Sequence, residues 1–251
     1  MARILIIGAL PLSLVNFRGP LIKALVAKGH QVLTAADGHD PGTAARLQEL
    51  GAEYHPIRIS RAGTNPCQDI LTFFDLLGLV RRTRPDVVLG YTIKPVIYGG
   101  VSARLCGVRE VFALIEGLGF VFMPCESLAR GLCSALARAM YRVGLMCSRR
   151  VFFLNPDDRD HFVRCGYVPG HKAVLLDGIG VDLGHYPQEK LPDVSRPRFL
   201  MVARLLKDKG VREYFEAARL IRRDRGEVEF VLAGAIDDNP GSRGQDERDR
   251  R

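Results

Sequence analysis

The sequence predicts an α/β fold built on a parallel sheet, with one complete domain followed by the beginning of a second. Short apolar runs alternate with amphipathic segments over most of the 251 residues, as expected when strands and helices follow one another in a sheet covered on both faces. This rhythm stops at a polar, proline-bearing stretch over residues 187–197 and then resumes. The length allows one full domain of roughly 100–200 residues and part of another.

Residues 1–186 are expected to form the first domain, in which seven apolar runs predict strands and six amphipathic segments predict helices. The strands are Ile4–Ile7, Gln31–Ala36, Tyr54–Ile59, Val87–Leu89, Val111–Leu114, Val151–Leu154 and Val174–Leu176. The helices are Pro20–Gly29, Gly42–Leu50, Ile70–Arg82, Val96–Leu105, Leu128–Met146 and Asp157–Arg164. Proline in a first turn and glycine after a last turn mark the bounds of the first helix.

After a linker over residues 187–197, a second strand-helix-strand unit begins. Its predicted elements are Phe199–Ala203, Val211–Arg223 and Val228–Ala233, within an incomplete domain over residues 198–242. Residues 243–251 contain no apolar side chain and are predicted to be disordered, because they have nothing to bury.

Composition narrows the classes of function and partner. The net charge of +8 favours an anionic partner, which leaves nucleic acid, an acidic membrane surface or a phosphorylated substrate. No nucleic-acid-binding module accompanies the charge, so no nucleic-acid partner is expected. The six cysteines are scattered and no histidines have ligand spacing, so we expect reduced thiols and no metal site. No stretch approaches the ~20 apolar residues of a membrane span.

The segment from Gly8 to Pro20 leads from the first strand into a helix amino terminus, which attracts anions. Asn16, Arg18 and Gly19 are therefore candidates for binding a diphosphate or an acceptor. The alternative is a tight connection in which the glycines serve only backbone geometry.

Two further strand ends carry candidate residues at the same edge of the sheet. Lys94 is placed to meet a phosphate or sugar oxygen, although it can also simply face water. Glu116 is a candidate acid, base or hydroxyl holder, or else a solvated carboxylate, and Gly117 and Gly119 follow it as candidate cleft-lining residues. These two glycines lack the rest of a dinucleotide-binding fingerprint. Residues 178–182 are either a ligand loop or a turn.

Residues 128–150 contain five arginines and no carboxylate, and their apolar side chains are spaced to form one face of a helix. That face consists of Leu132, Leu136, Ala139, Met140, Val143 and Met146. A basic amphipathic helix suits an anionic membrane, with Arg138, Arg142, Arg149 and Arg150 facing the lipid. The alternative is a helix whose apolar face covers the core and whose basic face is solvated.

In the second domain, Arg204 follows a strand and Lys209 and Gly210 precede a helix. Two cations and free backbone donors at such a junction can surround a diphosphate. A basic loop without a ligand is equally compatible with this pattern.

Taken together, these segments resemble the family 4 glycosyltransferases of the GT-B fold, in particular the bacterial branch that builds capsule, exopolysaccharide and lipid-linked oligosaccharides. The matching segments are LVNFRGPLIKALVAKGHQV, YTIKPVIYGG, EGLGFVF, GIGVDL and, most specifically, VARLLKDKGVREYFEAARLI.

The resemblance implies two Rossmann-like domains, with the acceptor bound mainly by the first and a nucleotide-sugar donor mainly by the second. Arg204 and Lys209 match the pair that grips the donor diphosphate, and Gly19 matches the loop facing it. These cations stand in for a metal, so metal-independent transfer without a cofactor is expected. The family's pair of glutamates in the second domain has no counterpart, which leads to the expectation of a truncated chain that is weak or inactive alone and leaves its catalytic residues unknown apart from Glu116.

The function expected from this resemblance is a retaining glycosyltransferase. It would transfer a hexose or N-acetylhexosamine from a UDP-sugar to a polyprenyl-diphosphate-linked saccharide, from a peripheral position at the cytoplasmic face of the cell membrane. The alternatives are a noncatalytic membrane- or partner-binding module derived from the first domain and a sugar-nucleotide epimerase of the same architecture.

Overall fold

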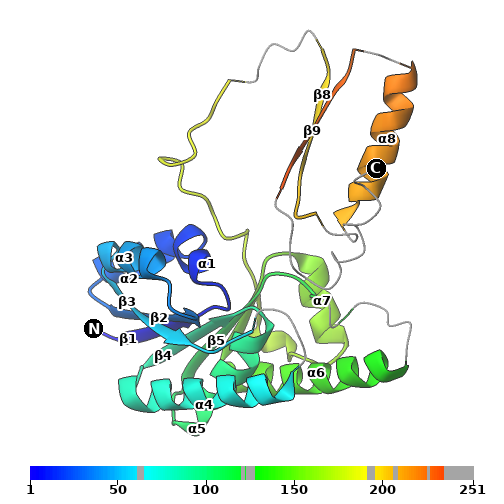
Figure 1. Cartoon of the computed structure of the whole chain (residues 1–251). Coiled ribbons are helices and arrows are strands. Elements are labelled where there is room, and N and C mark those ends of the chain that lie inside the picture. The colour runs from blue at the N-terminus through cyan, green and yellow to red at the C-terminus, as the bar shows by residue number, and fades with distance from the viewer. Residues whose placement is uncertain are drawn as a thin grey trace. The chain divides into compact units, whose positions relative to one another are not determined.

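The computed structural model describes residues 1–60, 65–119, 122, 128–190, 196–205, 209–224 and 227–234, with only the backbone of residues 128–130, 132 and 133. The chain divides into two compact units, unit 1 over Met1–His185 and unit 2 over Tyr186–Arg251 (Figure 1). The predicted tail over residues 243–251 and the end of the predicted incomplete domain lie outside the described residues.

Unit 1 contains a seven-stranded sheet in which every neighbouring pair of strands is parallel. The strands are β1 (Arg3–Ile7), β2 (Gln31–Asp37), β3 (Ala52–Ile57), β4 (Val87–Tyr91), β5 (Glu110–Ile115), β6 (Arg150–Phe153) and β7 (Ala173–Leu175). Their order is β3-β2-β1-β4-β5-β6-β7. The order reverses between β1 and β4, where ligands of open α/β sheets bind beyond the carboxyl ends of the strands. The predicted α/β class is confirmed.

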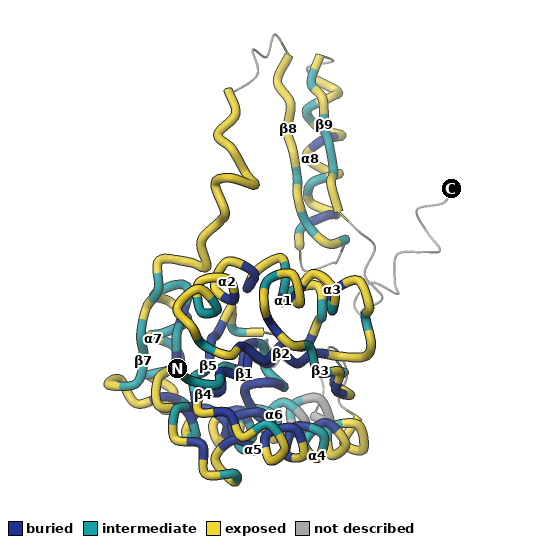
Figure 2. The backbone as a smooth tube through the Cα atoms, turned by 90° about the vertical axis from the view of Figure 1, so that its left-hand side faces the viewer, coloured by how far each residue is buried: buried dark blue, intermediate teal, exposed yellow. Residues whose placement is uncertain are grey.

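Helices cover both faces of this sheet (Figures 1 and 2). On one face lie α1 (Pro11–Asn16), α2 (Gly19–Ala27) and α3 (Pro41–Glu49). On the other lie α4 (Pro66–Thr83), the π-helical turn η1 (Pro95–Gly99), α5 (Gly100–Leu105) and α6 (Leu128–Cys147). The helix α7 (Pro156–Arg164) and the 3-10 turn η3 (Gly170–Lys172) lead from β6 to β7.

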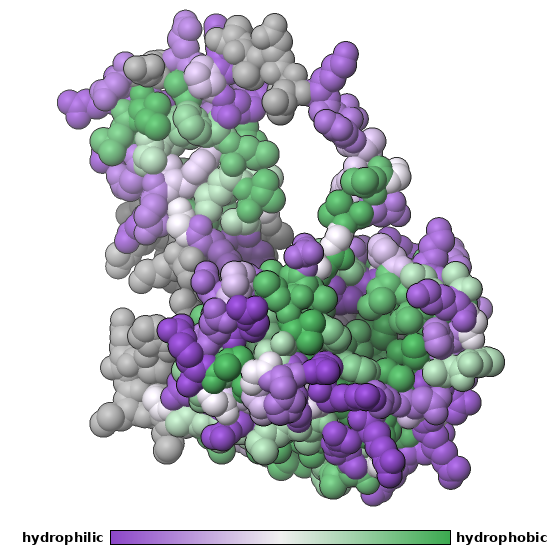
Figure 3. Space-filling model, turned by 180° about the vertical axis from the view of Figure 1, so that it is seen from behind, coloured by the Kyte–Doolittle hydropathy of each residue, from purple (hydrophilic) through white to green (hydrophobic). Residues whose placement is uncertain are grey.

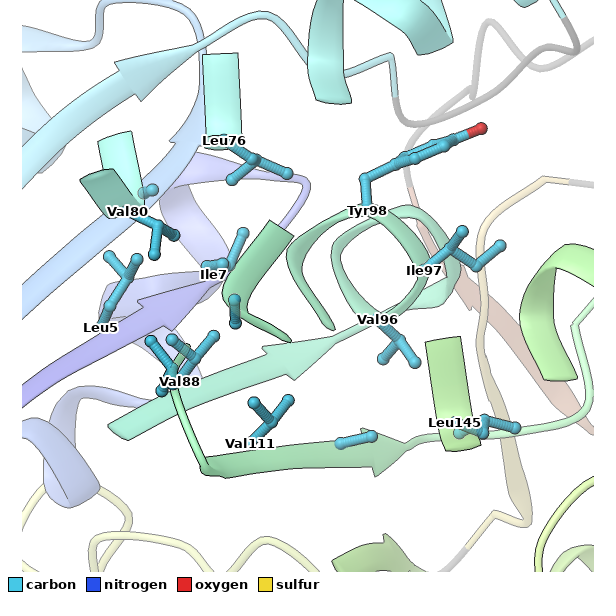
Figure 4. Packing of buried hydrophobic residues seen from close by; sticks show 14 of the residues in the cluster. Leu5, Ile7, Leu76, Val80, Val88, Val96, Ile97, Tyr98, Val111 and Leu145 are labelled. Atoms are coloured by element: carbon cyan, nitrogen blue, oxygen red, sulfur yellow. The ribbon is translucent and has the colours of Figure 1, made fainter. Parts of the chain in front are cut away.

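Alternating side chains along each strand separate two cores. In β1, Leu5 and Ile7 belong to the core under α4, η1 and α6, whereas Ile4 and Ile6 belong to the core under α1, α2 and α3. Figure 4 shows the first core, in which Leu76, Val96 and Leu145 from three helical segments meet the strands. Because both faces are covered, inner strands such as β1 and β4 are mostly apolar, which made them predictable as continuous runs.

Two helical segments differ from the prediction in kind and not only in their bounds. No helix was predicted between Gly8 and Pro20, but Pro11–Asn16 form α1, with Pro11 in the first turn and Leu14 buried. The expected helix over Val96–Leu105 begins as the π-helical turn η1 before continuing as α5. There Gly99 lies so close to Ile7 that an added Cβ would be 2.8 Å from its Cδ1.

The described residues of unit 2 form one strand-helix-strand unit made of β8 (Arg198–Val202), α8 (Val211–Asp224) and β9 (Glu229–Ala233), with β8 and β9 parallel. The α8 helix covers one face of the pair, since the Tyr214 hydroxyl lies 3.0 Å from the Phe199 carbonyl and 2.9 Å from the Val231 carbonyl. Leu200 and Val202 are exposed. Hydrophobic side chains reach the surface of both units on the face seen in Figure 3.

Candidate functional site

The ends of β1, β4 and β5 are neighbours in the sheet, so the segments that follow them meet at one edge. These segments carry most of the candidate residues of unit 1, and they lie at the reversal point of the strand order, between β1 and β4. The structure therefore brings together residues that are about 100 positions apart in the sequence, Arg18 and Glu116.

Arg18 and Glu116 form an ion pair at this edge. Arg18 joins α1 to α2, its Nη2 donates to Glu116 Oε1, and its Nη1 donates to the Phe17 carbonyl at 3.2 Å. The Arg18 side chain is 3% exposed and that of Glu116 is 32% exposed. A buried cation thus holds a carboxylate that solvent or a ligand can still reach. The remaining Nε of Arg18 is buried without a hydrogen-bond partner.

The ring of Tyr91, at the end of β4, packs against the guanidinium of Arg18. The guanidinium Cζ lies 4.4 Å from the centre of the Tyr91 ring, a cation–π contact. The Tyr91 hydroxyl lies 2.7 Å from Ser13 Oγ. Burial raises the Tyr91 pKa to about 12, although the hydrogen bond with Ser13 and the charge of Arg18 oppose the rise, so the phenol stays neutral near pH 7. Gly8 makes room for this ring, because a Cβ there would be 2.2 Å from the hydroxyl oxygen.

Thr92, the next residue, adopts a conformation that β-branched residues rarely accept, with φ of 68°. Its Oγ1 is buried and has no hydrogen-bond partner. Such backbone strain costs ~1–3 kcal/mol and gathers at functional sites. The sequence did not predict Thr92 as a site residue, because the segment YTIKP over residues 91–95 contains no residue type that indicates a positive φ at Thr92.

Phe122, six residues after Glu116, packs among aromatic rings. The ring of Phe122 lies 5.1 Å from that of Phe162 and 5.3 Å from that of Tyr167. Gly119 has φ of 73°, which favours glycine, and a Cβ there would be 3.0 Å from Ile93 Cδ1. Gly117 is exposed with open space around its Cα. Of these two predicted cleft-lining glycines, Gly119 therefore occupies a position whose backbone favours glycine, whereas the position of Gly117 would accept a side chain.

Lys94 is held away from open solvent by an ion pair with a helix. Its Nζ donates to Asp69 Oδ1 of α4 at 2.6 Å, and the two side chains are 15% and 21% exposed. Tyr98 lies next to Asp69, and burial, reinforced by the Asp69 charge, raises its pKa above the usual value. The sequence placed Lys94 at the ligand edge, but a ligand anion there would have to compete with Asp69.

The remaining predicted residues of unit 1 flank the edge. Asn16 ends α1 and is exposed. Gly19 opens α2 and is buried, with Leu50 Cδ1 3.6 Å from the position of an added Cβ. Arg18 and Gly19 thus join the cluster through the junction of two helices, as the sequence suggested, while Asn16 lies at the margin.

Of the candidate diphosphate residues of unit 2, Lys209 and Gly210 directly precede α8. Arg204 follows β8 and is exposed, as is Lys209. Gly210 has φ of 75°, and its carbonyl accepts the Tyr214 amide at 2.9 Å, the first bond of α8. Lys209 therefore lies at a helix amino terminus, where backbone donors attract anions, and Arg204 lies just after the preceding strand.

The four candidate membrane-facing arginines occupy different environments. Arg142 is exposed on α6, and Arg138 is half-buried there. Arg149 and Arg150 lie beyond the end of α6, where Arg149 pairs with Glu110 and Arg150 donates to the His171 carbonyl. Within the described residues, no helix combines the length and hydrophobicity that a membrane span needs. Nor does any group of three or more His, Cys, Asp or Glu side chains in that part of the chain form a possible metal site.

Comparison with known proteins agrees with this architecture. Residues 17–177 match the family model of the glycosyl transferase 4-like domain. The chain is 26% identical, over 240 residues, to the N,N'-diacetylbacillosaminyl-diphospho-undecaprenol alpha-1,3-N-acetylgalactosaminyltransferase of Campylobacter jejuni. It is also 26% identical, over 164 residues, to the UDP-Gal:alpha-D-GlcNAc-diphosphoundecaprenol alpha-1,3-galactosyltransferase of Escherichia coli.

These matches cover 91% and 61% of the chain but only 62% and 41% of the two relatives. Among solved structures, S. aureus MnaA with UDP has a TM-score of 0.63 and 16% identity, covering 97% of this chain and 64% of that chain. The structural likeness shows a shared fold. Since the family model covers more than half of the sequence, the chain belongs to the glycosyl transferase 4-like family, the family 4 glycosyltransferases of the GT-B fold.

Proposed function

We propose that this protein takes part in retaining transfer of a hexose or N-acetylhexosamine from a UDP-sugar to a polyprenyl-diphosphate-linked saccharide. The observation that carries the proposal is the Arg18–Glu116 pair at the ligand-binding edge of a family 4 domain. A partly exposed carboxylate fixed by a buried cation is suited to accept a hydrogen bond from a sugar hydroxyl. The relatives act on saccharides linked to undecaprenyl diphosphate, and their names support an acceptor of this class.

In this proposal Glu116 orients the attacking hydroxyl of the acceptor. The bond between the anomeric carbon and the UDP oxygen breaks, a new bond to the acceptor oxygen forms, and the acceptor proton passes to the departing diphosphate. The alpha-1,3 linkages in the relatives' names support retention, because UDP-hexoses commonly carry an α-linked sugar. Arg18 acts as a positioning residue, because its own side chain is buried.

Arg204 and Lys209 would stabilise the negative charge that develops on the leaving UDP, helped by the backbone donors at the start of α8. The S. aureus structure with bound UDP supports a nucleotide site in this fold. Such a pair of cations supplies the charge that a metal provides in other transferases. The identity of the donor sugar and the role of any further part of the protein are likewise proposed and not observed.

Binding measurements with the 251-residue chain test each half of the proposal separately. A water-soluble, short-chain polyprenyl-diphosphate disaccharide should bind, and Glu116→Gln should weaken it about tenfold, the loss of one charged hydrogen bond. UDP-GlcNAc and UDP-Gal should bind more weakly to Arg204→Ala and Lys209→Ala by a similar factor. Arg212→Ala, an exposed cation on α8, is the matched control and should bind as the original chain does.

A transfer assay with the same disaccharide and labelled UDP-sugars then identifies the product, and the anomeric proton coupling in its NMR spectrum reports retention or inversion. The proposal fails if neither UDP-sugars nor GDP-sugars bind or react. Appearance of an epimerised UDP-sugar without acceptor would instead show epimerase activity.

A second candidate function, a noncatalytic membrane-binding module, is favoured by one observation. Leu136, Val143 and Met146 of α6 are exposed, so the apolar face of this basic helix does not cover the core. In this candidate, the chain would lie at the cytoplasmic face of the membrane without catalysing sugar transfer. It would then bind vesicles but neither UDP-sugar nor saccharide.

A further inference from the structure

Two helices of unit 1 carry apolar stripes that point away from the sheet. On α4, Ile70, Leu71 and Phe74 are exposed, while Leu76, Leu79 and Val80 belong to the core. On α6, Leu136, Val143 and Met146 are exposed, while Tyr141 and Leu145 belong to the core. At 100° per residue, each exposed set lies on the side of its helix opposite the buried set. All six side chains are 41–63% exposed.

These stripes belong to one surface, the outer side of the α4–α5–α6 layer. The helix α5 contacts both α4 and α6, and all three lie on the same face of the sheet in Figures 1 and 2. Leu105, at the end of α5, is also exposed, so each helix of the layer contributes apolar surface. Single exposed apolar residues are ordinary, but stripes on neighbouring helices form a patch that marks an interaction site.

The charges near this surface are mainly positive. Arg81 and Arg82 occupy the last turn of α4, Arg104 lies in the last turn of α5, and Arg142 is exposed on α6. The carboxylates of the layer are engaged elsewhere, since Asp69 pairs with Lys94 and Asp75 pairs with Arg58. The surface therefore combines exposed apolar side chains with cations.

We propose that the outer surface of the α4–α5–α6 layer docks on an anionic lipid bilayer. Apolar side chains would enter the boundary between headgroups and acyl chains, and the arginines would contact anionic headgroups. A second copy of the chain fits less well, because a symmetric contact through this surface would bring arginines against arginines. This inference deepens the proposed function, because it states which side of unit 1 faces the membrane that carries a polyprenyl-linked acceptor.

Vesicle binding by the whole chain tests the proposal without donor or acceptor, so its outcome is independent of sugar transfer. The original chain should sediment with vesicles of phosphatidylcholine and phosphatidylglycerol. The variant Leu71→Gln/Phe74→Gln should bind tenfold or more weakly, and so should Val143→Gln/Met146→Gln. Arg81→Gln/Arg142→Gln should lose binding to anionic vesicles, roughly fivefold per arginine. The control Leu12→Gln/Leu21→Gln changes two exposed leucines on the opposite face of the sheet and should bind normally.

The absence of tryptophan from the sequence allows a direct readout of insertion. Phe74→Trp and Val143→Trp should each shift their emission to the blue on adding vesicles and be quenched by brominated lipid, whereas Leu21→Trp should not. All variants change exposed positions, so their unfolding temperatures should match that of the original chain. Unchanged emission of both reporters in a chain that binds vesicles overturns the proposal. So does a concentration-dependent dimer that the α4 and α6 substitutions abolish, because the surface would then bind a second copy.

Discussion

Replacing Glu116 by alanine should destabilise unit 1 more than replacing the arginine that it contacts. The substitution leaves the guanidinium of Arg18 without its carboxylate, and the Arg18 side chain is only 3% exposed. Removing one partner of a fully buried pair costs about 3–5 kcal/mol. The Tyr91 ring, 4.4 Å from Arg18 Cζ, offsets about 1 kcal/mol of this. Because Glu116 is 32% exposed, the pair is worth less than a fully buried one, and we expect a loss of about 2–3 kcal/mol.

The converse substitution, Arg18→Met, should cost only about 1–2 kcal/mol, mainly the cation–π contact and one charged hydrogen bond. The carboxylate that remains can be hydrated where it stands, and methionine fills much of the space of the arginine stem. The double variant Arg18→Met/Glu116→Ala should resemble Arg18→Met alone, since no charge is then left buried. The coupling energy then equals the whole cost of Glu116→Ala, about 2–3 kcal/mol.

Hydrogen exchange during urea unfolding, followed by mass spectrometry on peptides from β1, β4 and β5, reports the stability of unit 1 separately from that of unit 2. The control is Glu110→Ala, which removes an exposed ion pair with Arg149 and should change stability by about 0.5 kcal/mol or less. The reasoning is refuted if Glu116→Ala costs no more than this control, or if Arg18→Met costs more than Glu116→Ala.

Three further predictions concern other parts of unit 1. Burial lowers the pKa of His55 below its ordinary value of 6.5 although Glu53 lies 3.2 Å away. On acidification, His55 is therefore protonated at a higher pH in the unfolded chain than in the folded one. Its contribution to the free energy of unfolding should be constant above about pH 6.5 and fall as the pH drops towards the pKa in the folded chain. Melting temperatures between neutral and mildly acidic pH should show this slope, and His55→Gln should flatten it. Gly144→Ala should cost ~1–3 kcal/mol, because its Cβ would be 2.7 Å from Ile97 Cα. By contrast, Gly131→Ala in the same helix has open space and should stabilise by up to ~1 kcal/mol in urea titrations. Thr92→Asn should raise stability by ~1 kcal/mol, since asparagine tolerates a φ of 68°, and an unchanged or lower melting temperature would contradict the strain.

Much of the fold was predictable because a buried parallel strand is apolar wherever it occurs. All seven strands of the first unit were expected, and the largest shift in bounds is at β3, observed over Ala52–Ile57 instead of Tyr54–Ile59. This strand lies at the edge of the sheet and contains Pro56, which an edge tolerates because one side needs no amide donor. The start of α4 was predicted too late in the sequence, although Asn followed by Pro is typical of a helix amino terminus. In the structure the Asn65 side chain accepts a hydrogen bond from the Cys67 amide at 3.1 Å.

The candidate site was predictable in its location but not in its contacts. Topology alone brings Arg18 and Glu116 to the same edge, since the ends of β1, β4 and β5 are neighbours. Whether they pair depends on the path of α1 and α2, and α1 was not expected. The predicted strand ended at Leu89, so Tyr91 was expected in the segment that follows it, and only the coordinates reveal that Tyr91 ends β4 and packs against Arg18. Lys94 had the right position for an anion, but its nearest carboxylate, Asp69, comes from a helix 25 residues earlier.

The orientation of α6 shows where a sequence pattern becomes ambiguous. The helix contains two apolar sets, one with Tyr141 and Leu145 and one with Leu136, Val143 and Met146, and either could face a core. Gly144 decides between them, because it lies beside Tyr141 and Leu145 and allows the backbone to approach Ile97 closely. A side chain at 144 would push α6 away from η1, so the larger and more regular apolar set has to face outward. Because α6 packs on η1 through its glycine face, its larger apolar stripe stays exposed and can bind a partner. The arginines around that stripe favour an anionic partner.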